Sequence, residues 1–337
     1  MMNVCICGGG SLGHVLSGWL AAKGKARVRV LTGKPDLWQD TLTVTAPDCV
    51  LTGVIDAVSA DPSEVIPDSD VIIICHPGFM IRKSLESIAP YLKEDAYVGC
   101  VFSSTGFFFE AHKVLRKTQP LWGFQRVPFI ARVSEYGRAA RLLGYKSSYH
   151  IAVENVTAAE KQAFAGVVED WFERPVYLLN NYYEASLTNS NPLLHTSRLF
   201  TMFGGKNEGK SFSRMIRFYE EWTDEASALL IKMDDELFEL LKVLPVSPSF
   251  LPRILDYYES HDPASLTRKL SSIESFKGIE SPMVRSEEGW EPDYKSRYFT
   301  EDFMHGLKYV WQLAHENSVS VPNIDMVYEW GCSKLKR

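Results

Sequence analysis

The stretch Asn3-Val4-Cys5-Ile6-Cys7-Gly8-Gly9-Gly10-Ser11-Leu12-Gly13 decides the fold of this 337-residue chain. A short apolar run leads into a G-x-G-x-x-G pattern, and helical spacing follows over residues 11–23. In such a strand–turn–helix unit the first glycine permits the tight turn, the second lets a pyrophosphate approach the backbone, and the third lets the helix lie close to the strand. The helix N-terminus offers free N–H groups to phosphates. An ordinary glycine turn is the weaker alternative, and we predict a dinucleotide site at Gly8, Gly10, Ser11, Leu12 and Gly13.

Strand-like and helical patterns alternate from the N-terminus to about residue 180. This alternation predicts a parallel sheet with helices on both faces. The pair of runs at 41–45 and 49–58, separated by Ala46-Pro47-Asp48, predicts an inserted hairpin. The other predicted strands are residues 3–7, 27–31, 71–75, 97–102, 149–153 and 175–179, and the predicted helices are 11–23, 81–92, 107–116 and one opened by the capping box at 157–160 and running to Phe172.

The character of the chain changes after Asn180, where long helical patterns such as residues 212–241 take over. At about 150 residues per domain, the length also suggests two domains. We therefore predict an α/β Rossmann-type NAD(P)-binding domain at residues 1–182. An all-α substrate and catalytic domain is predicted at residues 183–337.

Composition excludes several classes of protein. The net charge is −6 and the pI is about 5.8, whereas a nucleic-acid binder usually has a basic face. No apolar run approaches the ~18 residues of a membrane span, and the N-terminus lacks the basic region of a signal peptide. The six scattered cysteines form no C-x-x-C pair, so we expect neither a metal site nor disulfides. We expect a cytoplasmic protein that acts on small molecules, without nucleic-acid or membrane partners; a homodimer is compatible with the sequence.

The end of the second predicted strand bears on the choice of cofactor. An NAD-binding domain usually has an acidic residue there, but this chain has Thr32-Gly33-Lys34. Lys34 suits the 2′-phosphate of NADP, although a solvated loop lysine is an equal alternative and NAD stays open. Ligands lie beyond the carboxyl ends of parallel strands, where His76 and Pro77 follow another strand. We predict that Thr32, Lys34, His76 and Pro77 border the cofactor.

Two polar segments stand out in the second half. In Asn189-Ser190-Asn191-Pro192-Leu193-Leu194-His195, Asn191 is a candidate N-cap before a first-turn proline, which places His195 one turn into a helix. Thr300 is a candidate N-cap for a second helix, with Asp302 in its first turn. An ionised carboxylate of this kind can orient a catalytic histidine and stabilise its imidazolium form.

These segments resemble the octopine/nopaline (opine) dehydrogenases, and the resemblance covers nearly the whole chain. The shared motifs are residues 5–10 (CICGGG), 127–132 (VPFIAR), 136–138 (YGR), 191–195 (NPLLH) and 296–302 (SRYFTED). The resemblance implies a Rossmann domain followed by a helical domain similar to that of 6-phosphogluconate dehydrogenase. It also implies NAD(P)H-dependent condensation of an L-amino acid with a 2-oxo acid through an imine, in a cleft between the domains.

The resemblance assigns roles to five residues. His195 matches the catalytic acid or base, Asp302 the carboxylate paired with it, and Arg297 a substrate-binding arginine. Arg132 and Asn191 are weaker candidates for substrate binding, since bracing a domain interface and capping a helix explain them equally well. The sequence departs from the family at Phe303-Met304-His305, where Ile-Pro and an aromatic residue are usual. This change puts the amino-acid specificity in doubt, and His305 either touches substrate or is merely exposed.

Two alternatives remain. A relative of ketopantoate reductase would reduce a 2-oxo acid, or oxidise the 3-hydroxy acid, with an NADP cofactor and without an amine. A nucleotide-binding sensor would bind NAD(P) and transfer no hydride.

Overall fold

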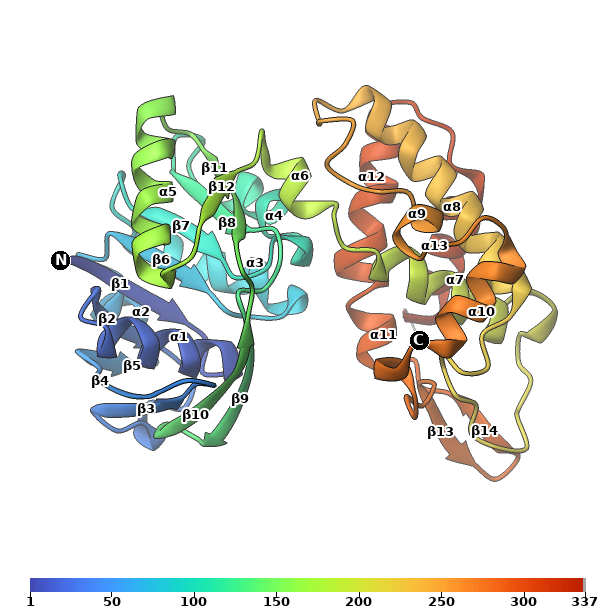
Figure 1. Cartoon of the computed structure of the whole chain (residues 1–337), viewed down its shortest axis with the longest axis horizontal. Coiled ribbons are helices and arrows are strands. Elements are labelled where there is room, and N and C mark those ends of the chain that lie inside the picture. The colour runs from blue at the N-terminus through green and yellow to red at the C-terminus, as the bar shows by residue number, and fades with distance from the viewer. Residues whose placement is uncertain (336–337) are drawn as a thin grey trace. The chain divides into compact units, whose positions relative to one another are not determined.

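The computed structural model describes residues 1–335, which divide into two compact units (Figure 1). The first unit is Met1–Leu187 and the second begins at Thr188. The first unit therefore extends five residues past the predicted boundary at 182 and includes helix α6 (Tyr182–Ser186). Side chains hold α6 there: Gln125 donates to the carbonyl of Glu184, and the Tyr182 ring packs 5.6 Å from that of Phe108.

An eight-stranded sheet forms the centre of the first unit. Its strand pairs are parallel except β8–β11, which is antiparallel. Residues of the first strand point alternately to the two faces of the sheet: Val4 and Ile6 lie in one hydrophobic cluster, and Cys5 and Cys7 lie in the other. The order is β12 (Val176–Leu178), β11 (Tyr149–Glu154), β8 (Leu121–Phe124), β7 (Tyr97–Cys100), β6 (Val71–Ile74), β1 (Met2–Cys7), β2 (Ala26–Leu31) and β5 (Ala57–Ser59).

Helices cover both faces of this sheet, as predicted (Figure 1). On one face, Trp19 of α1 donates its indole N–H to the Trp171 carbonyl of α5 at 2.9 Å. The predicted capping box of Thr157 and Glu160 opens α5. The helices of this unit besides α6 are α1 (Ser11–Ala22), α2 (Pro62–Val65), α3 (Gly78–Ile88), α4 (Phe107–Val114) and α5 (Ala158–Phe172).

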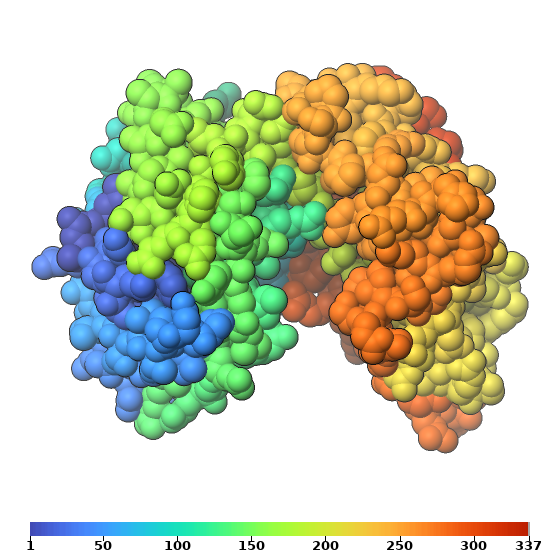
Figure 2. Space-filling model, in the orientation of Figure 1, coloured from blue at the N-terminus to red at the C-terminus, as the bar shows by residue number. Residues whose placement is uncertain are grey.

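A second sheet packs beside α1, and the sequence predicted only half of it. The hairpin of β3 (Thr41–Thr45) and β4 (Val50–Val54) is present, although residues 57–59 leave it to form β5 of the main sheet. Strand β10 (Ala139–Tyr145) pairs with β3 and with β9 (Phe129–Glu135). Residues of β3 and β10, about 100 positions apart in the chain, thus lie side by side, and the blue and green surfaces adjoin in Figure 2.

The second unit is mostly helical, and the prediction that it contains no strand was wrong. A two-stranded hairpin of β13 (Met283–Ser286) and β14 (Gly289–Pro292) lies among its helices. The predicted helix at 212–241 begins only at Asp224, because the Thr223 side chain caps it by accepting from the Ala226 N–H. The helices are α7 (Asn191–Phe203), α8 (Asp224–Val243), α9 (Ile254–Tyr257), α10 (Pro263–Ser272), α11 (Arg297–Thr300), α12 (Lys308–Glu316) and α13 (Pro322–Leu335).

Both predicted N-caps in this unit were also wrong. Asn191 is the first helical residue of α7 and follows Ser190 at the cap position. Thr300 ends the single turn of α11 instead of opening a longer helix. In the part of the chain that the structure describes, we find no helix with the length and apolar character needed to cross a membrane.

A buried histidine joins α1 to the second sheet. His14 Nδ1 lies 2.9 Å from the Gly10 carbonyl, and His14 Nε2 accepts the Gly137 N–H at 2.8 Å in the turn between β9 and β10. Accepting at Nε2 requires a neutral ring. Burial lowers the pKa of His14 below its usual value, which keeps the ring neutral.

We expect protonation of His14 to weaken the fold in mild acid. The unfolded chain binds this proton more readily than the native state, so the free energy of unfolding should fall as the pH drops from 7 to 5. His14→Leu should lower that free energy by about 1–3 kcal/mol at pH 7, since the Gly137 N–H loses its acceptor. The free energy of unfolding of the variant should also change less with pH than that of the wild type. Urea titrations of both proteins check this; parallel pH curves would exclude His14 as the titrating group, because His76 and His150, whose pKa values are also lowered, are retained in both.

Candidate active site

The nucleotide loop has the geometry that its glycines predicted. Gly8 has a φ of +124°, a conformation that residues with a Cβ rarely adopt. A Cβ on Gly13 would lie 1.8 Å from the Gly8 carbonyl oxygen, so only glycine lets α1 approach the end of β1 this closely. Gly10 is the N-cap of α1, and a Cβ placed on it would meet no atom within 4 Å. Gly8, Gly10, Ser11, Leu12 and Gly13 therefore form one turn, with the open backbone that a pyrophosphate requires.

Thr32 and Lys34 form one rim of this loop together with a residue that was not predicted there. The Thr32 hydroxyl lies 3.3 Å from that of Tyr136, and Lys34 Nζ lies 5.7 Å from the centre of the Tyr136 ring. A Cβ on Gly9 would approach the Thr32 and Tyr136 hydroxyls within 2.5 Å. The motif at 136–138 was the available signal for Tyr136, but nothing in its spacing connected it with the end of β2.

His76 and Pro77 form the opposite rim. The His76 ring lies against Gly8, where an added Cβ would be 2.9 Å from it. His76 Nδ1 lies 2.6 Å from the Ser84 hydroxyl, and burial lowers the pKa of His76, which favours the neutral ring. Pro77 is the N-cap of α3. The structure thus brings all the predicted cofactor residues to one end of the sheet.

Arg132 also belongs to this region of the first unit. The neighbouring Val133 N–H donates to the Ser11 hydroxyl at 3.2 Å, so β9 passes the start of α1. Arg132 is exposed, and among residues 1–335 its guanidinium donates to the carbonyl of Ala131 alone. Arg132 therefore belongs to the unit that carries the predicted nucleotide turn, whereas the other predicted substrate residues belong to the second unit.

In the second unit, the structure joins the predicted histidine and aspartate. His195 Nδ1 lies 2.8 Å from Asp302 Oδ2, and the His195 residue is 8% exposed. His195, Arg297, Tyr298, Glu301 and Asp302 line a pocket of about 260 Å³. Within residues 1–335, the exposed guanidinium of Arg297 has neither an ion pair nor a hydrogen bond, so it is available to a carboxylate. Asn191 lies one turn before His195, exposed and outside this lining.

A π-helical turn at Phe303–Leu307 sets the position of Asp302. The Leu307 N–H donates to the Asp302 carbonyl at 2.7 Å, an i to i+5 bond. Gly306 lies against Pro192 at the start of α7, since a Cβ there would be 2.6 Å from the proline ring. The π turn therefore packs beside the helix that carries His195. Such turns are frequent at functional sites and cannot be recognised from helical spacing.

His195 has a further partner that the sequence did not reveal. Its Nε2 lies 2.8 Å from the hydroxyl of Tyr219, so both ring nitrogens are hydrogen-bonded. The ring also packs 4.7 Å from Tyr298 and 5.6 Å from Phe218, centre to centre. Burial raises the pKa of Tyr219 and of Tyr298, with a contribution from the Asp302 charge in each case. Tyr219 lies within residues 212–241, for which the sequence predicted only a helix, so nothing marked it as a partner of His195.

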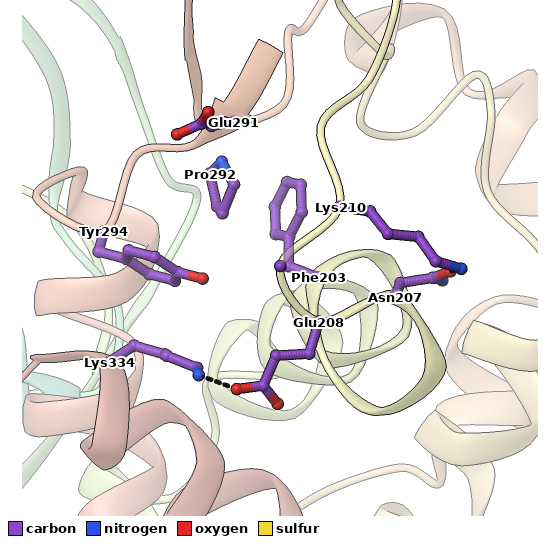
Figure 3. Close-up of a pocket in the computed structure, with 9 residues that line it drawn as sticks. Phe203, Asn207, Glu208, Lys210, Glu291, Pro292, Tyr294 and Lys334 are labelled. Atoms are coloured by element: carbon purple, nitrogen blue, oxygen red, sulfur yellow. Dashed lines mark hydrogen bonds and ion pairs between the residues drawn. The ribbon is translucent and has the colours of Figure 1, made fainter. Parts of the chain in front are cut away.

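A second pocket, of about 370 Å³, contains none of the predicted site residues (Figure 3). Its charged side chains are satisfied within the protein. The buried Lys334 pairs with Glu208, and Lys210 donates to the Asn207 side chain at 3.0 Å. The lining comprises Phe203, Asn207, Glu208, Gly209, Lys210, Glu291, Pro292, Tyr294 and Lys334.

Comparison with known proteins identifies the family. A model described as NAD/NADP octopine/nopaline dehydrogenase, alpha-helical domain, matches residues 178–335, and one for ketopantoate reductase matches residues 4–104. The octopine dehydrogenase of Mizuhopecten yessoensis is 26% identical, and the alignment covers 99% of this chain and 90% of that protein. This chain belongs to the octopine/nopaline dehydrogenase family.

Other members of the opine dehydrogenase family agree with this assignment. The tauropine dehydrogenase of Arabella iricolor is 26% identical, and the alignment covers 98% of this chain and 90% of that protein. A solved octopine dehydrogenase with NADH and L-arginine matches with a TM-score of 0.85 at 25% identity, covering 100% of this chain and 90% of that one. The Rossmann-like domain, the helical domain and the resemblance are thereby confirmed. The roles of the individual residues remain predictions.

We expect Lys34 to select the cofactor. Lys34→Ala should weaken NADPH binding about tenfold or more, since a hydrogen bond to a charged group contributes about 1.5–3 kcal/mol. NADH binding should change little, because NADH lacks the 2′-phosphate. Fluorescence titration with both cofactors measures this. Lys117→Ala, an exposed lysine before β8 at the other end of the sheet, is the matched control. Equal weakening of both cofactors would exclude the role.

Proposed function

We propose that this opine dehydrogenase condenses an L-amino acid with a 2-oxo acid and reduces the resulting imine with NAD(P)H. The observation that carries the proposal is the His195–Asp302 pair beside the exposed Arg297 guanidinium in one pocket. Relatives named octopine and tauropine dehydrogenase, and solved octopine dehydrogenases with NADH and either L-arginine or pyruvate, support it. Further support comes from the open glycine turn of the first unit, which fits a dinucleotide.

The first unit supplies the binding site for the cofactor. The turn from Gly8 to Gly13 would hold the pyrophosphate, Lys34 and Thr32 would meet the adenosine ribose, and His76 would border the nicotinamide. When bound, the reduced nicotinamide supplies a hydride, which is the redox chemistry that protein side chains lack. The task of the remaining residues is to bind, to orient and to move protons.

The second unit supplies the proton-transfer groups. The substrate amine attacks the carbonyl carbon of the 2-oxo acid: the C–N bond forms, the C=O double bond opens, and a proton passes from nitrogen to oxygen to give a carbinolamine. His195 can then donate a proton to the hydroxyl group, which leaves as water while the nitrogen lone pair forms the C=N bond of the protonated imine. Asp302 stabilises the imidazolium that this step requires, because its carboxylate accepts from Nδ1.

Arg297 is suited to hold a substrate carboxylate in this pocket. Its planar guanidinium can donate two parallel hydrogen bonds to a carboxylate, and a lysine cannot reproduce that geometry. Both proposed substrates, as well as the product, carry a carboxylate. We assign Arg297 to substrate binding, and we assign Asn191 and Arg132 weaker positioning roles, because neither lines the His195 pocket.

Two further features of the proposal concern the cellular setting. All six cysteines are free thiols, which suits a reducing compartment, so we place the enzyme in the cytoplasm. A homodimer is the oligomer that we propose, and light scattering on the purified protein tests it.

The substrate requirement separates this function from its nearest alternative. Oxidation of NAD(P)H should require a 2-oxo acid such as pyruvate together with an L-amino acid, and a panel of amino acids identifies the preferred one. Amine-independent oxidation would instead support a reductase of the ketopantoate type, whose family model matches residues 4–104. Cofactor binding without any turnover would support a sensor.

We expect His195→Ala to separate catalysis from cofactor binding. Loss of a general acid or base typically lowers the rate 10²- to 10⁴-fold, so kcat should fall by at least about 100-fold. Cofactor affinity should stay within about twofold, because His195 and the nucleotide loop belong to different units. Steady-state kinetics and fluorescence titration of the same preparation measure both quantities. Unchanged turnover would remove His195 from the mechanism.

A further inference from the structure

Both nitrogens of the His195 ring are bonded to other side chains of the same unit. Nδ1 meets Asp302 and Nε2 meets the hydroxyl of Tyr219, each at 2.8 Å. The two partners lie 83 residues apart (302 − 219), on different segments of the unit. The ring cannot rotate without breaking both bonds, so its orientation is fixed by the pair.

Tyr219 is itself held rigidly. Its ring stacks on Phe276, with centres 4.2 Å apart, and meets the edge of Phe218 at 4.9 Å. Tyr219 is only 5% exposed. A displaced Tyr219 would leave this aromatic cluster, so the hydroxyl stays beside Nε2.

Helix α7, which carries His195, also forms hydrogen bonds with the segment that carries Tyr219. Arg198, one turn further along α7, donates from Nε to the Phe218 carbonyl at 3.2 Å and from Nη2 to the Glu221 carbonyl at 2.6 Å. Arg198 is 3% exposed, and burial lowers its pKa to about 10, which still leaves it charged at neutral pH. Helix α7 therefore holds the Tyr219 segment twice: through His195, which contacts the Tyr219 hydroxyl, and through Arg198, which binds the backbone on either side of Tyr219.

The tyrosine hydroxyl can serve both protonation states of His195. Asp302 accepts from Nδ1–H, so Nε2 is the nitrogen that gains or loses a proton. The Tyr219 hydroxyl donates to Nε2 when the ring is neutral and accepts from Nε2–H when it is charged, by rotation of its hydrogen alone.

We propose that Tyr219 is a positioning residue, which together with Asp302 fixes the orientation of the His195 ring. The inference rests on the proposed function only for its effect on turnover. The charged and titratable groups around His195 are Asp302, Tyr219 and Tyr298, with Arg297 and Glu301 on the pocket lining and Arg198 behind the Tyr219 segment. Tyr219→Phe removes one hydroxyl and leaves all of the others in place.

Nuclear magnetic resonance of the histidine side chains tests this without any turnover. In long-range ¹H–¹⁵N spectra of the wild-type protein, neutral His195 should carry its proton on Nδ1, with assignment by comparison with His195→Ala. The ¹⁵N resonance of Nε2 in neutral His195 should move downfield in Tyr219→Phe, because Nε2 loses the hydroxyl that donates to it. Tyr328→Phe, which removes a hydroxyl from another buried tyrosine of this unit, should leave that resonance unchanged.

Kinetics then separate positioning from a general structural effect. Tyr219→Phe should lower kcat about tenfold and leave both substrate KM values within about twofold. In the His195→Ala background the same substitution should have no further effect, because Tyr219 acts through His195.

Three results would overturn the proposal. They are a neutral His195 protonated on Nε2 in the wild type, an unchanged Nε2 resonance in folded Tyr219→Phe, and an equal loss of kcat from Tyr219→Phe in the His195→Ala background. The first of these does not depend on the variant folding. A wild-type enzyme inactive with every substrate pair would refute the proposed function, while the resonance measurements would still decide the role of Tyr219.

Discussion

The hydrogen bond between His195 and Asp302 connects two segments 107 residues apart, and the architecture of the second unit is arranged around it. Asp302 reaches the histidine because the chain makes a π turn instead of continuing α11 into α12. That turn approaches α7 through the contact of Gly306 with Pro192. Because the Nδ1 proton is accepted by a carboxylate, proton exchange is confined to Nε2, and the environment of that atom decides how the histidine works.

In the first unit, the corresponding constraint is a close contact between two backbone segments. Close approach of backbone to backbone, at Gly8 and Gly13, opens the phosphate site, and side chains close its rims. His14 ties this turn to the second sheet by bonding Gly137, the neighbour of Tyr136. The second sheet therefore contributes to the proposed cofactor site, because it places Tyr136 beside Thr32 and Lys34.

Local patterns predicted the features that depend on local physics. Period-two apolar runs gave the central strands, the Thr157–Glu160 capping box gave α5, and the glycine spacing gave the nucleotide turn. The catalytic candidates came from the motifs at 191–195 and 296–302. Features that depend on long-range packing were missed: β9 and β10, the β13–β14 hairpin, and the partner of Nε2. Residue type alone did not decide the two N-caps: the turns begin after Ser190 and Ser296, and neither serine makes a side-chain capping bond.

At the first position where the sequence departs from the family motif, Phe303, the structure shows a role in core packing. Phe303 is completely buried, stacked on Phe299 and in edge contact with Trp330. Its ring fits only because residue 331 is glycine: a Cβ there would lie 2.2 Å from the Phe303 ring. The ring of Phe303 thus occupies the space that a side chain at Gly331 would need. Since Phe303 is absent from the lining of the His195 pocket, its side chain contributes to the anchoring of the π turn and not to the surface of that pocket.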